Sequence, residues 1–119
     1  MKNNLEKITL PLVSIIVPVY NGENFIQESI TSLLAQTYSH HEIIVVNDGS
    51  TDATSTLLTS FGDKIKIIDQ ANQGQGVARN NGCKEAKGTF FAFLDSDDIL
   101  DVNYLEKQVS FLIKHLEAV

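Results

Sequence analysis

The chain has 119 residues, of which 43% are hydrophobic, and this length suffices for one compact domain with a buried core but not for two. Its formal net charge of −6, with Arg79 as the only arginine, excludes the extended basic surface that binds nucleic acid. A ligand that carries a diphosphate would meet few positive charges, so a divalent cation would have to accompany it.

The N-terminal residues 1–12 predict a short lead-in, and the folded domain is expected over residues 13–119. Pro11 and Pro18 interrupt the apolar residues near the N-terminus, so we expect neither a signal peptide nor a membrane span. The single cysteine, Cys83, rules out an internal disulfide and agrees with a reducing compartment. We therefore expect a cytoplasmic location.

The first regular segment, residues 13–19, consists almost entirely of β-branched and apolar residues. Such a run predicts a strand that is buried on both faces of a parallel sheet, and Pro18 marks where that strand ends. A helix is expected over residues 25–36, because its apolar residues fall on one face. Those residues are Ile26, Ile30, Leu33 and Leu34.

A second strand is expected over residues 42–47. The turn 48–52 follows it, and there Ser50 or Thr51 is suitably placed to cap a second helix. That helix is expected to end at Gly62.

The next strand, residues 64–69, alternates charged and apolar residues, which suits a strand near the sheet edge with one face in water. A polar, glycine-bearing stretch, residues 70–76, leads into a third helix that ends near Ala86. The last strand, residues 89–94, is apolar and runs directly into an acidic cluster. An apolar stripe then predicts a C-terminal helix containing Leu105, Val109, Leu112 and Leu116.

This order repeats a strand and a helix four times with short connections. Because crossovers between parallel strands are right-handed, the pattern predicts a mostly parallel sheet with helices on both faces. The fold class is therefore α/β, with a Rossmann-like, three-layer α/β/α arrangement.

Polar residues follow three of the four expected strands. In an open α/β sheet, ligands bind at the carboxyl ends of the strands, where the strand order reverses. All of these residues should therefore lie along one edge of the sheet. They are Tyr20, Asn21 and Glu23 after the first strand, Asp48, Gly49 and Ser50 after the second, and Asp95, Asp97 and Asp98 after the fourth.

Four carboxylates on one rim, those of Asp48, Asp95, Asp97 and Asp98, repel one another unless a cation binds between them. Carboxylate oxygens with open positions suit Mg²⁺ or Mn²⁺. Such an ion would bridge the protein to a diphosphate and stabilise it as a leaving group. The alternative for the acidic run 95–98 is a solvated helix start that the helix dipole favours.

Asp48 is placed to accept hydrogen bonds from a base or a ribose, with Gly49 allowing close approach and Tyr20 able to stack on the base. The alternatives are a turn that only caps a helix for Asp48 and ordinary packing for Tyr20. Arg79 is read equally as a phosphate contact and as a surface salt-bridge residue.

Four segments together resemble the family 2 glycosyltransferases, whose domain has the GT-A fold. Residues 13–21 (VSIIVPVYN), which include Pro18, resemble the first strand and uridine loop of that family. Residues 44–52 (IVVNDGSTD) resemble its second motif, with Asn47 in place of the first of two acids. The polar segments around residues 72–82 and the FLDSDD of residues 93–98 resemble the third motif and the DxD motif.

The resemblance implies roles for individual residues. It places Asp48 against the base, Asp95 toward the ribose and diphosphate, Asp97 as the direct metal ligand, and Asp98 in support. Nucleotide-sugar contacts are implied for the loop and strand-end residues Pro18, Tyr20, Asn21, Glu23, Gly49, Arg79 and Ser96.

The activity implied is inverting transfer from a nucleotide-diphosphate sugar, with a leaning to UDP-sugars, to an acceptor hydroxyl of a sugar or lipid-linked glycan in polysaccharide biosynthesis. The acceptor half of that family and its catalytic base lie beyond the DxD motif, so we expect the base beyond Val119 and identify no catalytic residue here. The chain is then a donor-binding domain that is inactive or slow alone. Self-association through exposed apolar surface and a membrane-associated full-length protein are further expectations.

Two other classes remain open. One is a non-catalytic nucleotide-binding or regulatory module that keeps the site. The other is a receiver-like signalling domain, which the length, acidity and α/β alternation allow, although its acidic pair would follow the first strand rather than the fourth.

Overall fold

The computed structural model describes residues 10–117, so most of the expected lead-in lies outside the described residues. None of the helices in this range is long and apolar enough to cross a membrane. The elements run in the order β1 (Val13–Val19), α2 (Ile26–Leu34), β2 (His41–Asp48), α3 (Thr54–Thr59), a 3₁₀ turn (Gly62–Lys64), β3 (Lys66–Gln70), α4 (Gln75–Glu85), β4 (Phe90–Phe93) and α5 (Tyr104–Glu117).

Within the described residues, the strands form a four-stranded sheet in the order β3-β2-β1-β4, and every neighbouring pair is parallel. All seven residues of β1 are buried, as expected for a central strand that is covered on both faces. β3 lies at an edge, as its alternating sequence predicts. The predicted parallel α/β fold is confirmed.

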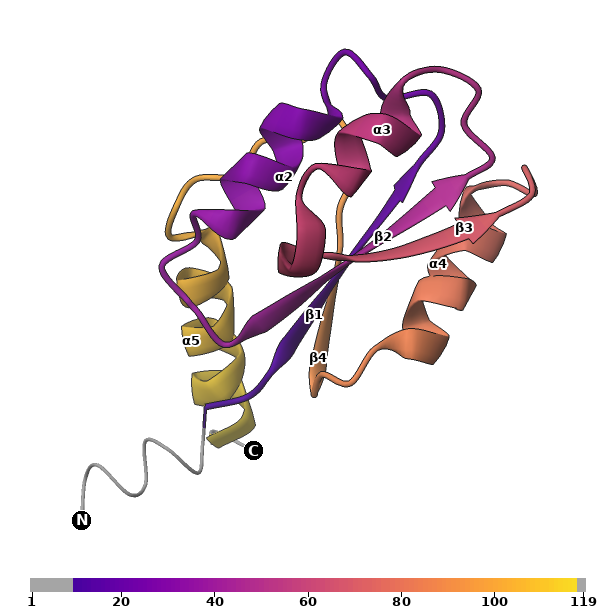
Figure 1. The fold of residues 1–119 in the computed structure, drawn as a ribbon. Coiled ribbons are helices and arrows are strands. Elements are labelled where there is room, and N and C mark those ends of the chain that lie inside the picture. The colour runs from indigo at the N-terminus through magenta and orange to yellow at the C-terminus, as the bar shows by residue number, and fades with distance from the viewer. Residues whose placement is uncertain (1–9, 118–119) are drawn as a thin grey trace.

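Helices cover both faces of this sheet: α2, α3 and α5 lie on one side and α4 on the other (Figure 1). The chain steps from β1 to β2 to β3 in one direction and then returns across the sheet to β4. Because each crossover is right-handed, that reversal moves the connecting helix to the opposite face. The result is the expected three-layer α/β/α arrangement.

Each face has its own apolar core, because side chains alternate along a strand. Ile15 and Val17 of β1 pack with α2, α3 and α5 in the larger cluster. Ile16 belongs to the smaller cluster, together with Ala78 of α4. Helix α4 approaches β1 closely at Gly82, where an added Cβ would lie 2.6 Å from Cγ2 of Ile16.

The start of α3 differs from the expectation. No side chain caps α3 from Ser50 or Thr51, and the helix begins only at Thr54. Instead, Asp52 accepts hydrogen bonds from the backbone N–H of Thr54, at 2.9 Å, and from its hydroxyl, at 2.5 Å. Ser50 and Thr51 are taken up in contacts with the loop after β1, which local sequence cannot reveal.

Two expected boundaries also shift. α3 ends at Thr59, and Gly62, with φ +60°, begins the 3₁₀ turn rather than ending the helix. Pro18 lies inside β1, paired with Val46. It is tolerated there because the pairing of β1 with β4 has already stopped at Ile16 and Phe93, so at Pro18 β1 has a partner strand on one side.

Candidate functional site

A cavity of about 460 Å³ opens at the carboxyl ends of β1, β2 and β4. It lies where β4 diverges from β1, which is also where the strand order reverses, the usual ligand site in such sheets. Its size falls in the range of small-molecule sites, about 300–1,000 Å³. The lining residues are Pro18, Val19, Tyr20, Phe25, Asp48, Asn72, Gly74, Gln75, Asp95, Ser96 and Asp97.

Asp48 lies at the end of β2, with only 5% of its surface exposed. Its carboxylate accepts hydrogen bonds from the backbone N–H of Gln73 at 2.8 Å, from the side-chain amide of Gln70 at 2.8 Å, and from the backbone N–H of Gly74 at 3.1 Å. Burial alone would raise the pKa of Asp48, but these hydrogen bonds outweigh it and hold the pKa below its ordinary value. The side chain is therefore a buried, ionised acceptor in the cavity wall.

A chain of amides supports Asp48 from behind. Asn81 of α4 donates to Oε1 of Gln70 at 2.6 Å, and Gln70 donates in turn to Asp48. An ionised carboxylate only accepts, so the direction of both amides is determined. Sequence reasoning missed Gln70, since a glutamine at the end of an edge strand carries no signal until the helix behind it is placed.

Gly49 brings the loop after β2 against the segment that lines the cavity. Its φ of +72° lies in the left-handed region, and an added Cβ would lie 2.7 Å from the backbone nitrogen of Asn72. Any other residue would therefore be strained and would displace Asn72. The close approach predicted at Gly49 exists, but its partner is the protein backbone.

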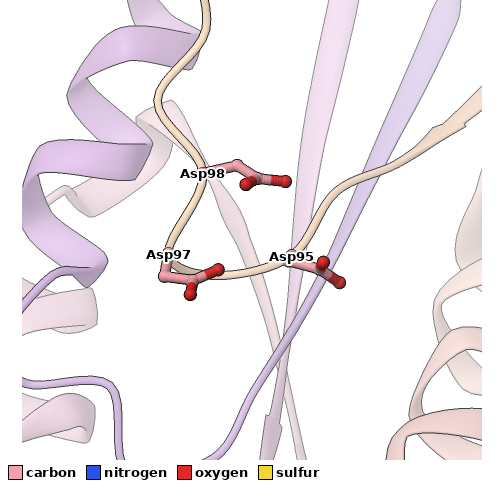
Figure 2. Close-up of side chains that lie close together, drawn as sticks. All are labelled: Asp95, Asp97 and Asp98. Atoms are coloured by element: carbon pink, nitrogen blue, oxygen red, sulfur yellow. The ribbon is translucent and has the colours of Figure 1, made fainter.

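The acidic cluster follows β4, and Figure 2 shows its three side chains, Asp95, Asp97 and Asp98, projecting from one short loop. One carboxylate oxygen from each lies within 4.8 Å of the others, and all three residues are exposed. Hard oxygen donors with room for water or phosphate oxygens suit Mg²⁺ or Mn²⁺. The donor set therefore fits such an ion.

Arg79 of α4 lies close to this cluster. Its Nη2 lies 3.9 Å from Oδ1 of Asp95, and Gln75 donates to the same oxygen at 3.3 Å. The Nε atom of Arg79 is buried without a hydrogen-bond partner. The Arg79 side chain as a whole is 42% exposed, so its guanidinium offers positive charge to an anionic group beside the cluster.

Asn21 and Glu23 are not in the cavity wall. Asn21, with φ +51°, accepts from the backbone N–H of Thr51 at 2.7 Å. Glu23 accepts from the N–H of Ala53 at 2.9 Å, and its own N–H donates to Asp52 at 3.2 Å. Both side chains join the loop after β1 to the loop after β2. These contacts fix the loop that carries Tyr20, which lines the cavity.

The structure thus gathers about half of the predicted contact residues around one cavity: Pro18, Tyr20, Asp48, Asp95, Ser96 and Asp97. Asn21, Glu23, Gly49, Arg79 and Asp98 lie beside it. Sequence reasoning missed Val19, Phe25, Asn72, Gly74 and Gln75 as lining residues. For the last three, the signal was a polar loop directly before a helix N-terminus.

Residues 14–119 match the family described as Glycosyl transferase family 2. The chain belongs to this family. An uncharacterized glycosyltransferase of Rickettsia prowazekii (strain Madrid E) is 51% identical over 114 residues, which are 96% of this chain and 35% of that protein. Family membership removes the receiver-like hypothesis.

Solved glycosyltransferases have the same fold. S. aureus TarS 1-349 in complex with UDP superimposes with a TM-score of 0.80 at 35% identity, over 87% of this chain and 32% of that one. The mannosyltransferase PcManGT from Pyrobaculum calidifontis, in complex with GDP-Man and Mn²⁺, gives a TM-score of 0.77 at 25% identity, over 86% of this chain and 32% of that one. This chain therefore spans about a third of the length of each of these three proteins, and its GT-A resemblance is confirmed.

Proposed function

We propose that the chain is a donor-binding domain that holds a nucleoside-diphosphate sugar, with UDP-sugars preferred, together with Mn²⁺ or Mg²⁺. One observation carries this proposal: Asp48, Asp95 and Asp97, which come from two separate strand ends, line one cavity. The ionised Asp48 lies at one part of the wall and the acidic cluster at another, so the cavity offers separate sites for a base and for a metal-bound diphosphate.

The wall residues suit the parts of such a ligand. Tyr20 is 50% exposed and lines the cavity, so its ring is free to stack on a base. Asp97 and Asp98 are the proposed metal ligands, and Asp95 faces the ribose and diphosphate. Arg79, whose Nη2 lies 3.9 Å from Oδ1 of Asp95, supplies positive charge near the phosphates.

The proposed reaction is an in-line displacement with inversion. The acceptor oxygen bonds to the anomeric carbon while the bond from that carbon to the β-phosphate oxygen breaks. The hydroxyl proton passes to a base, and the electron pair leaves with the nucleoside diphosphate. Bound Mn²⁺ or Mg²⁺ supplies Lewis-acid stabilisation of the diphosphate charge.

The base and the acceptor site are proposed to come from outside this chain. In support, the relatives are much longer, with this chain matching 35% of one and 32% of another. We assign no catalytic base among residues 10–117. A sugar or lipid-linked glycan acceptor, a role in polysaccharide biosynthesis and a cytoplasmic site remain part of the proposal.

The complexes of the relatives support the ligand class. TarS binds UDP and UDP-GlcNAc, and PcManGT binds GDP-Man with Mn²⁺. The uridine preference follows the relative with higher identity, 35% against 25%.

The test is calorimetric titration of UDP into the chain with MnCl₂ or with EDTA. Wild type is expected to bind UDP more tightly with Mn²⁺ than with EDTA. Asp97→Asn should reduce the affinity for UDP in the presence of Mn²⁺ by at least about tenfold, which is about 1.4 kcal/mol. Asp101→Asn is the control, since it makes the same charge change in the same loop outside the cluster. Equal Mn²⁺-dependent affinity of Asp97→Asn and wild type would contradict the proposal.

A further inference from the structure

Three polar side chains face residues 96–105: Ser29 and Ser32 of α2, and Gln36, which follows the end of that helix; we name them the polar ladder. Ser29 and Ser32 are three residues apart and lie on one side of the helix, and the side-chain amide of Gln36 donates to the carbonyl of Ser32 at 3.3 Å. Ser29 is 2% exposed and Gln36 is 6% exposed, in the midst of an apolar core. Buried polar groups require partners, and here those partners all belong to residues 96–105 or to α2 itself.

Ser29 holds the backbone on both sides of Asp97. Its hydroxyl oxygen lies 2.7 Å from the carbonyl oxygen of Ser96 and 2.6 Å from that of Asp98. A hydroxyl has one proton, which the two carbonyls share. This one side chain therefore fixes the backbone from which the side chain of Asp97, the proposed metal ligand, projects.

The other two side chains hold the rest of the loop. Ser32 accepts from the N–H of Leu100 at 3.2 Å. Gln36 donates to the carbonyl of Asp101 at 2.6 Å and accepts from the N–H of Leu105 at 3.0 Å, which joins the loop to the start of α5. The polar ladder thus contacts the loop from Ser96 to the first turn of α5.

The carboxylates need this support. Asp95, Asp97 and Asp98 are exposed and carry like charges within 4.8 Å, so mutual repulsion drives them apart. The loop has few hydrogen bonds of its own, among them the one from Asp98 N–H to Asp95 O at 3.1 Å. We therefore infer that hydrogen bonds to the backbone of this loop keep the three carboxylate groups close together.

We propose that Ser29, supported by Ser32 and Gln36, is a positioning residue for the divalent cation: by fixing the carbonyls that flank Asp97 it preorganises the three carboxylates. The inference rests on the proposed function, and it adds that metal affinity depends on a helix that provides no ligand. Supporting groups of this kind typically alter metal affinity about 10–100-fold.

The experiment compares Ser29→Ala with Thr31→Ala, which removes an exposed hydroxyl that bonds only within α2, to Gln27 O. The readout is the gain in UDP affinity on adding MnCl₂, relative to EDTA. Ser29→Ala is expected to reduce that gain about 10–100-fold while leaving affinity in EDTA unchanged, and Thr31→Ala should match wild type. A purely structural role would lower both affinities together, and that result, or an undiminished gain, would overturn the inference.

A second measurement needs no ligand. Amide hydrogen exchange over residues 96–100 is expected to be faster in Ser29→Ala than in Thr31→Ala, and equal rates would overturn the inference even if wild type binds Mn²⁺ and UDP. If wild type shows no Mn²⁺-dependent gain, the proposed function fails, whatever the exchange rates are. Should Ser29→Ala not fold, Ser32→Ala is expected to change both readouts in the same direction by less, and no change would count against the proposal.

Discussion

At the scale of single residues, Asp48 shows how a buried charge is made tolerable. Removing a carboxylate from water is costly unless hydrogen bonds replace the water. Here two backbone N–H groups and the amide of Gln70 do so, which turns an unfavourable group into the link between β2 and the segment 72–74. The same contacts leave the side chain in the cavity wall.

This arrangement predicts a pH-dependent contribution to stability. The folded pKa of Asp48 is below its ordinary value of 3.8, so its contribution to stability is complete above that pH and is lost as the pH falls through the lower folded pKa. Asp48→Asn should cost about 1–3 kcal/mol at neutral pH, because its amide cannot accept the same bonds.

Urea unfolding should show that the difference in free energy of unfolding between wild type and Asp48→Asn becomes smaller below about pH 4, as Asp48 of the wild type takes up a proton. Asp63→Asn, at an exposed position, is the control and should show little gap at either pH. A gap for Asp48→Asn that stays constant with pH would contradict the assignment.

At the scale of elements, α4 is the helix whose position matters most for the cavity. Among the helices of residues 10–117, it alone covers the second face of the sheet (Figure 1), and it carries Gln75, Arg79 and Asn81 toward the site. Its apolar cluster is small, with Ala78 as the buried helix residue, so close backbone approach at Gly82 replaces large side chains. The position of α4 therefore depends on close backbone packing against the sheet more than on the area of its apolar contacts.

Two glycines of α4 provide a matched test. In Gly82→Ala the new methyl would lie 2.6 Å from Ile16, and overpacking of this kind costs about 1–3 kcal/mol. In Gly76→Ala nothing lies within 4 Å, and the better helix former should stabilise by about 0.5–1 kcal/mol. Urea unfolding of the pair measures the difference, and equal effects would show that α4 shifts freely.

At the scale of the whole molecule, the reversal of strand order produces both the cavity and an open edge. β4 is an edge strand, and Phe91 and Phe93 share the face of Ser14 and Ile16, with 43% and 50% of their surfaces exposed. Unpaired strand edges with exposed aromatic residues favour association with other chains.

We therefore predict concentration-dependent self-association of this chain, measured by sedimentation. Phe91→Lys should shift the chain toward monomer, since a charge on an edge strand opposes pairing. Phe111→Lys, at a position that is 58% exposed on α5, should leave the association unchanged. A monomer at all concentrations would refute the prediction.

The features of the fold and the site that could be predicted are those that depend on local sequence patterns. The strands, their parallel direction and the acidic rim followed from periodicity and from the rule that strand ends share an edge, and Asp48, Asp95 and Asp97, expected on that edge, line one cavity. The cap of α3 was wrong, because Ser50 and Thr51 bond to the loop after β1, a contact between residues about 30 positions apart.

The sequence by itself determined the fold class and the edge of the sheet where polar groups collect, because these depend on hydrophobic period and strand polarity. The family followed separately, from the resemblance of four motifs. Only the tertiary structure decided which side chains face the cavity. Gln70, Ser29 and Gln36 receive their roles from partners 22 to 69 residues away. The role of a buried polar side chain depends on its hydrogen-bond partner, and when that partner is distant in the sequence, only folding brings the two together.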